Sequence, residues 1–238
     1  MMSMVLAVLG LCPVLAPMIG NGLQALDSWR LVFWFLAGWG VLVSVLAGVL
    51  LPETRSVQAR AQFPLGRTLH TYAQILRDGR FIPYTLTLCV AQAGFFAYIA
   101  GSSSVFISHY ALSPTQFSLL FALNAVGLVV AAIINPLVHA RLGVLTTFRV
   151  VNSAYFVVLA LLLGAMLAGV THLAVLCGGL FVAVTLLGLL MPTGSQLAMQ
   201  QQGAVAGTAS ALLGSLQFGF GAVITAVSGA LAHHGGLG

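Results

Sequence analysis

Five polar side chains stand inside long apolar runs of this sequence and have the chemistry of ligand anchors. They are Gln92, Tyr98, Ser102, Asn124 and Gln217. Amide and phenol groups beside aromatic residues such as Phe95 and Phe218 suit a mostly apolar ligand that is held by a few polar contacts. The same groups also bond neighbouring helices to one another, so each has a structural alternative. We treat these five residues as candidates for lining a substrate path.

Residue patterns typical of enzymes and metal sites are absent from the sequence. It contains no Cys-x-x-Cys pair, no His-Glu-x-x-His metal motif, no Gly-x-x-x-x-Gly-Lys phosphate loop and no Gly-x-Ser-x-Gly nucleophile motif. The adjacent His233 and His234 would point about 100° apart on a helix, and no carboxylate accompanies them. We expect no enzymatic activity, no metal and no cofactor.

The composition decides the class of protein. Of the 238 residues, 60% are hydrophobic and 5% are charged, whereas about a quarter of the residues of a soluble globular domain are charged. A disordered chain is also excluded, because such chains are rich in charge and poor in apolar residues. The net charge of +5 is the balance of eight arginines, in or beside polar connections, and three acidic residues. These indicate membrane topology rather than nucleic-acid binding, so we predict an integral membrane protein whose partner is the lipid bilayer.

Seven apolar runs are long enough to cross a bilayer, since a helical span needs about 20 apolar residues. They cover residues 2–22, 31–51, 82–107, 115–139, 146–169, 171–194 and 204–232. The first run lacks the basic start of a signal peptide and is longer than the apolar part of one, so we count it as a span. The prediction is an all-α, polytopic transmembrane helix bundle of about seven spans.

The arginines predict how these spans are oriented. Five arginines lie in the polar stretch 52–80. Arg141 lies between the fourth and fifth spans and Arg149 at the start of the fifth, on the same side. Only Arg30 lies on the opposite side. By the positive-inside rule the arginine-rich side is cytoplasmic. We therefore expect a cytoplasmic amino terminus and an external carboxyl terminus.

Small residues at regular spacing predict where helices pack, because they let backbones approach closely. The longest such stripe lies in the last span and shorter ones lie in the third and fourth. The members are Gly203, Gly207, Ala211, Ser215, Gly219, Ala222, Ala226 and Ala230; Ala93, Ala97 and Gly101; and Gly127 and Ala131. We interpret all three stripes as contacts between helices.

The first span and its surroundings resemble a known family. Residues 12–22 read Cys-Pro-Val-Leu-Ala-Pro-Met-Ile-Gly-Asn-Gly, followed by Trp-Arg-x-x-Phe at 29–33 and Leu-Pro-Glu-Thr at 51–54. This set resembles spans five and six of the twelve-helix major facilitator drug/proton antiporters, in particular the bicyclomycin-resistance (Bcr/CflA) efflux family. Pro13, Ala16, Pro17 and Gly20 match that family's antiporter-motif helix, whereas Asn21 stands where a second glycine is usual.

The resemblance continues in order along the chain. Arg-Phe-x-Pro-Tyr at 80–84, Phe-Ala-Leu-Asn at 121–124 and Gly-Thr-Ala-Ser at 207–210 are similar to family spans seven, eight and eleven. Arg141 and Gly143 match a cytoplasmic loop motif in which Ala140 replaces the usual acidic residue. The resemblance implies a partial major facilitator fold that corresponds to family spans five to eleven.

This resemblance implies a division of the chain into three parts. Residues 1–51 correspond to the last two spans of the N-terminal six-helix bundle, 52–80 to the cytoplasmic loop between bundles, and 81–238 to the first five spans of the C-terminal bundle. The segment 65–77 is helix-like, with basic residues around an apolar face, namely Arg67, Arg77 and Arg80 around Leu65, Leu69, Tyr72 and Leu76. It has the features of a membrane-surface helix, but we favour a cytoplasmic linker helix.

The implied activity is efflux of small amphipathic compounds in exchange for protons, across a bacterial inner membrane. Proton coupling usually needs an ionisable group within the membrane, yet Asp27, Glu53 and Asp78 fall in loops or at span ends. His109, His139 and His172 lie near span ends, where we expect solvation at the interface. We therefore expect no export by this chain alone, and expect it to need the family's N-terminal spans or another chain as partner. The alternative is a non-transporting membrane protein that associates with other helices, or a gene remnant.

Overall fold

The computed structural model describes residues 19–20, 22–23, 29–50 and 65–234. Contacts divide the chain into two compact units, 1–67 and 68–238, and each is considered by itself. In the first unit, α2 (Trp29–Leu50) is 22 residues long and apolar enough to span a membrane. Of the first predicted span, 2–22, only residues 19, 20 and 22 lie in the described part of the chain.

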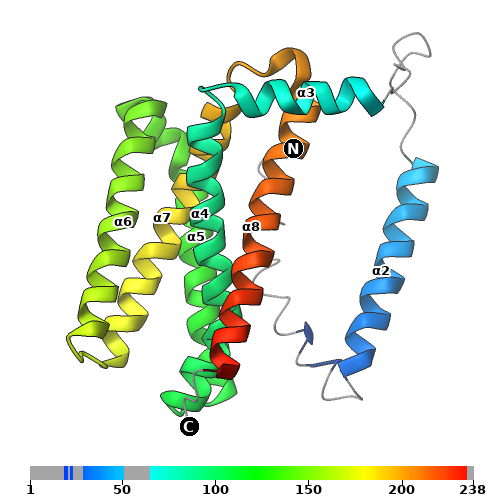
Figure 1. The fold of residues 1–238 in the computed structure, drawn as a ribbon. Helices are drawn as coiled ribbons and strands as arrows, with labels where there is room; N and C mark the ends of the chain where they lie inside the picture. Colours follow the sequence, from blue (N-terminus) through cyan, green and yellow to red (C-terminus); the bar gives the residue numbers. More distant parts are fainter. Residues whose placement is uncertain (1–18, 21, 24–28, 51–64, 235–238) are drawn as a thin grey trace. The chain divides into compact units, whose positions relative to one another are not determined.

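Five further spans make up the second unit, together with one short helix outside them. The elements are α3 (Leu65–Arg77), α4 (Ile82–Ser103) with a π-helical turn η2 (Ser104–His109), α5 (Pro114–Leu142), α6 (Val144–Leu167), α7 (Leu173–Met199), a 3₁₀ turn η3 (Gly203–Val205) and α8 (Ala206–His234). Figure 1 shows α4 to α8 side by side, with α3 crosswise at one end of them. Six described helices are long and apolar enough to cross a membrane, so the predicted all-α transmembrane architecture is confirmed.

The second unit is built around α4 and α7. The main pairs are α4 with α8, α5 with α7, α6 with α7, and α4 with α7. Their shared core contains Phe81, Leu88, Leu187, Leu190 and Ala209, all of which are buried. Because α7 contacts the four other spans and α4 contacts both α7 and α8, this core fixes the positions of all five spans.

Glycines allow α5 and α7 to approach each other closely. A Cβ atom at Gly127 would collide with the Thr185 hydroxyl, and one at Gly188 would collide with the backbone carbonyl of Leu128. Gly127 and Ala131 are both buried. The predicted contact stripe of the fourth span is therefore confirmed.

The predicted stripe of the last span makes no such contact within the described part of the chain. Its members from Gly203 to Ala230 are all exposed, and no atom lies within 4 Å of a Cβ placed at its glycines. Instead α8 packs on α4 through another face, on which Ala209, Leu213 and Gly221 are buried. Within the described residues the stripe is therefore not the face by which α8 packs on α4, because small residues permit a contact whereas the neighbouring side chains decide which face is used.

The third span follows its predicted stripe only in part. Ala93 is 6% exposed and buried, as expected for a contact. Gly101, however, has no atom within 4 Å of the position of a Cβ. Contacts of this stripe within the described residues are therefore confined to its first turns.

Two helix ends differ from the prediction. A single residue, Gly143, separates α5 from α6, and its φ of 77° lies in the left-handed region that favours glycine. The last turns of α7 continue past the predicted end at 194 to Met199. There Thr193 donates a hydrogen bond to the Leu189 carbonyl (2.6 Å), and Pro192 is accommodated inside the helix.

Candidate functional site

The contact between α4 and α8 fixes which residues of the two helices face each other. The Phe96 ring lies 6.0 Å from the Phe218 ring and occupies the space that a Cβ at Gly221 would fill. Figure 1 shows that both helices begin at the same end of the bundle, so they are parallel. One turn before this contact lie Gln92 on α4 and Gln217 on α8. These two candidate residues therefore lie at the same level of the α4–α8 pair.

Both amides are half-buried and unpaired. Among the described residues, no hydrogen-bond partner is found for the side chain of Gln92 or of Gln217. The Thr85 hydroxyl, two turns before Gln92 on the same face of α4, is fully buried and also has no partner. A polar group without a partner in an apolar environment carries a cost of about 1–3 kcal/mol. These groups can therefore gain free energy by bonding a polar ligand or water.

The other three candidates bond within the bundle. The Asn124 side-chain amide donates to the Tyr98 hydroxyl at 2.8 Å, and the Tyr98 ring stacks on Phe121 with centroids 6.0 Å apart. These contacts join α4 to α5. The Ser102 hydroxyl is buried and donates to the Ile99 carbonyl of its own helix at 3.0 Å. Tyr98 and Asn124 therefore stabilise the packing of α4 against α5, whereas the Ser102 hydroxyl bonds only within α4.

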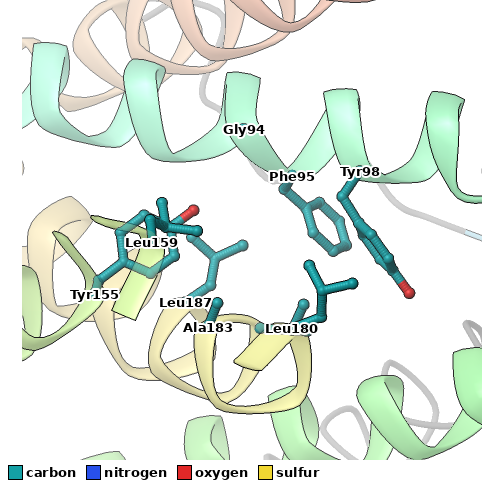
Figure 2. A pocket seen from close by; sticks show the side chains of 9 residues that line it. Gly94, Phe95, Tyr98, Tyr155, Leu159, Leu180, Ala183 and Leu187 are labelled. Carbon is teal, nitrogen blue, oxygen red and sulfur yellow. The ribbon is translucent and has the colours of Figure 1, made fainter. Parts of the chain in front are cut away.

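A small pocket lies behind Tyr98, between α4, α6 and α7. Figure 2 shows Phe95 and Tyr98 next to each other on α4, with the Tyr98 hydroxyl pointing away from Tyr155. The remaining lining is aliphatic, and the cavity volume is about 30 Å³. Sites for drug-sized ligands measure about 300–1,000 Å³. This cavity has room for a water molecule but not for such a ligand.

A buried polar cluster between α5 and α7 was not predicted. The Thr193 hydroxyl lies 2.9 Å from the His139 Nε2 atom and 3.1 Å from the Asn135 Oδ1 atom. Asn135 is 4% exposed and Thr193 is fully buried. The expectation that His139 is solvated at the interface was therefore incomplete, because the Thr193 hydroxyl is its partner. The signal in the sequence was the four-residue spacing of Asn135 and His139, which places both on one face of a helix.

A second polar cluster ties the connection before α4 to the connection before α8. Asp78 accepts hydrogen bonds from the Arg80 backbone N–H (2.9 Å) and from the Gln202 side-chain amide (2.6 Å). The Arg80 guanidinium in turn donates to the Gln201 side-chain carbonyl at 2.5 Å. The Asp78 carboxylate therefore serves as an acceptor at one end of the bundle, outside the spans.

The two family motifs are described to different extents. Arg141 is exposed near the end of α5, and the positive φ of Gly143 explains why the loop motif has a glycine there. In the antiporter-motif helix, Pro13, Ala16 and Pro17 lie outside the described residues. Gly20 is helical, and no described atom lies within 4 Å of a Cβ placed there.

The described part of the chain is a bundle of long apolar helices with polar groups inside it and without a metal-binding cluster. Such a bundle belongs to the class of polytopic membrane proteins. The sequence profile of the Major Facilitator Superfamily matches residues 1–226. The chain therefore belongs to this superfamily, which consists of transporters rather than enzymes.

Three relatives show which branch of the superfamily is similar. The chain is 30% identical to the Uncharacterized MFS-type transporter YdgK of Bacillus subtilis, an alignment that covers 95% of this chain and 57% of the relative. It is 25% identical to the Bicyclomycin resistance protein homolog of Haemophilus influenzae (94% and 56%) and 28% identical to Multidrug resistance protein D of Escherichia coli (94% and 55%). The chain thus spans little more than half the length of these relatives. No solved structure matches the chain. The resemblance to a major facilitator drug-efflux family is confirmed.

Proposed function

We propose that this chain takes part in the export of small amphipathic compounds across a bacterial inner membrane, in exchange for protons. The observation that carries the proposal is the pair of half-buried, unpaired amides of Gln92 and Gln217 at one level of α4 and α8. Such groups between apolar helices suit a ligand with a few polar atoms on an apolar body. The names of two relatives, a bicyclomycin resistance protein homolog and a multidrug resistance protein, support this class of compound.

The proposal assigns proton coupling to a group outside the spans of this chain. No predicted span contains an aspartate or glutamate, and ionisable groups within the membrane mark proton pathways. Alternating access also needs two helix bundles that move against each other around the site. The proposed partners are therefore protons, a small amphipathic substrate, and helices from the family's N-terminal spans or another chain.

Binding of a cationic dye tests the proposal directly. We expect the purified 238-residue chain in lipid nanodiscs to bind a lipophilic cation, measured by fluorescence polarisation. Changing Gln92→Leu or Gln217→Leu is expected to weaken binding about two- to tenfold, because one hydrogen bond contributes about 0.5–1.5 kcal/mol. The matched control is Gln74→Leu, which removes an exposed amide from α3 and leaves binding unchanged.

Either of two outcomes would contradict this assignment. Equal binding by the wild type and the Gln92→Leu/Gln217→Leu double variant would show that the amides do not contact the ligand. Absence of binding by a correctly folded wild type would favour the alternative of a non-transporting, helix-associating protein. The exposed small-residue stripe of α8 is the observation that favours that alternative.

The proposed orientation places the amino terminus in the cytoplasm. We expect a cysteine at position 236 (Gly236→Cys) to react with a membrane-impermeant maleimide added to intact cells, and one at position 62 (Gln62→Cys) to remain unlabelled. The physical reason is the arginine excess of the 52–80 side. The background replaces Cys12, Cys89 and Cys177 by alanine. The reverse labelling pattern would refute the orientation.

A further inference from the structure

Helix α3 has an apolar face that the described part of the chain leaves uncovered. Its Ile75 side chain is buried in the core of the bundle, at 3% exposure, whereas Leu69 and Leu76 are 65% and 44% exposed. Leu69, Tyr72 and Leu76 follow at spacings of three and four residues, which places them on one face of the helix. The exposed side chains of His70, Gln74 and Arg77 lie on the other side. The helix is therefore amphipathic, although Ile75 alone is buried among the apolar residues whose exposure the structure describes.

The position of α3 relative to the spans is fixed by a short connection. The helix ends at Arg77, and only residues 78–81 separate it from the first residue of α4. Phe81 is fully buried, and Asp78 is held by Gln202 of the connection before α8. Figure 1 shows α3 crosswise at the end of α4 and α8. A helix held crosswise at the end of a membrane span lies where the hydrocarbon meets the lipid headgroups.

The charges around α3 are those of a surface that binds anionic lipid. Arg77 and Arg80 are exposed. The nearby acidic group, Asp78, already accepts two hydrogen bonds. Basic residues at a membrane surface are attracted to anionic headgroups by about 1 kcal/mol each. The exposed leucines thus suit the acyl chains of the membrane interface, and the neighbouring arginines suit its phosphates.

We propose that α3, which the sequence pattern favours as a cytoplasmic linker helix, lies in the plane of the membrane surface and binds the anionic lipids of the bilayer. Leu69, Tyr72 and Leu76 enter the upper acyl region, and Arg77 contacts the phosphates. The helix then anchors the start of α4 at the membrane surface. This surface is separate from the amides of Gln92 and Gln217, so the proposal does not depend on substrate binding.

An environment-sensitive fluorophore on single cysteines tests this proposal in the full 238-residue chain. The chain is reconstituted into phosphatidylcholine vesicles with and without phosphatidylglycerol, in a background that lacks the natural cysteines. The labelled positions are Leu69→Cys and Leu76→Cys, with His70→Cys and Gln74→Cys as matched controls on the opposite face. We expect blue-shifted emission at 69 and 76, quenched by lipids brominated on the upper acyl chain, and neither effect at 70 and 74.

The lipid charge gives a second, independent readout. Arg77→Gln is expected to lower the ratio of lipid-bound to detached α3 about fivefold in phosphatidylglycerol vesicles, which is the factor for one basic residue at an anionic surface. It leaves the ratio unchanged in phosphatidylcholine alone. A label at Leu161→Cys, on an exposed position of the α6 span, reports that the protein has inserted in every sample.

Two results would overturn the proposal when the α6 label is quenched normally. Emission typical of water at both 69 and 76 would show that the leucine face is solvated. Blue-shifted emission without quenching by brominated lipid would show that another protein surface, rather than lipid, covers the face.

Discussion

Replacing Gly188 by alanine is expected to destabilise the helix bundle by about 1–3 kcal/mol, as overpacking of a filled core does. Gly188 is buried where α7 crosses α5, and a Cβ there would collide with the Leu128 carbonyl and lie 3.0 Å from the Ala131 Cβ. A backbone carbonyl cannot rotate away as a flexible side chain can, so the two helices have to separate. The loss is measured as a fall in the midpoint of unfolding of the purified protein in mixed detergent micelles.

Gly178→Ala is the matched control, because Gly178 lies on the same helix with no atom within 4 Å of its Cβ position. Alanine is a better helix former than glycine by about 1 kcal/mol, so this variant is expected to be neutral or slightly more stable. Changes of opposite sign in the unfolding midpoint of the two variants would separate the effect of the close contact from that of helix propensity. Equal effects at positions 178 and 188 would show that α5 and α7 do not approach as described.

Thr193→Val is expected to cost about 1–3 kcal/mol, the usual effect of leaving a buried polar group without its partner. Valine has nearly the same shape as threonine but removes the hydroxyl that lies between His139 and Asn135. Asn135 is 4% exposed, so its side-chain oxygen loses its donor where water cannot replace it. The same unfolding experiment measures the effect.

Thr87→Val provides the comparison for this variant. The Thr87 hydroxyl is half-buried and bonds only the Pro83 carbonyl of its own helix, at 2.9 Å. We expect a change close to zero, because the helix keeps its backbone bonds and no second side chain loses a partner. A loss at position 87 as large as that at 193 would attribute both effects to the helix rather than to the α5–α7 cluster.

The spans were predictable because membrane helices follow from local composition. Six predicted runs correspond to described helices, and the predicted helix over 65–77 has the same bounds as α3. The ends of the spans were less accurate at turn-forming residues. Gly143 alone makes the turn between α5 and α6, and α7 continues past the predicted end at Gly194 to Met199.

The arrangement of the candidate site depends on contacts between helices that are distant in the sequence. Residue types alone indicated Gln92 and Gln217. That the two side chains lie at the same height along the α4–α8 pair follows from the packing of Phe96 against Gly221. In the same way, the pairing of Tyr98 with Asn124 depends on how α4 meets α5. Spacing within one helix shows which residues share a face, whereas only packing shows what that face meets.

The pairing of α4 with α8 has a consequence for how the protein is made. The chain is synthesised from its amino terminus, so α4 is complete well before its most extensive partner, α8, has been made. A single helix is stable in lipid because its backbone hydrogen bonds are satisfied internally. During this interval the face of α4 that carries Thr85, Gln92 and Phe96 has no α8 to pack against. Insertion of α4 therefore precedes its packing against α8, and the α4–α8 pair forms only after α8 has been made.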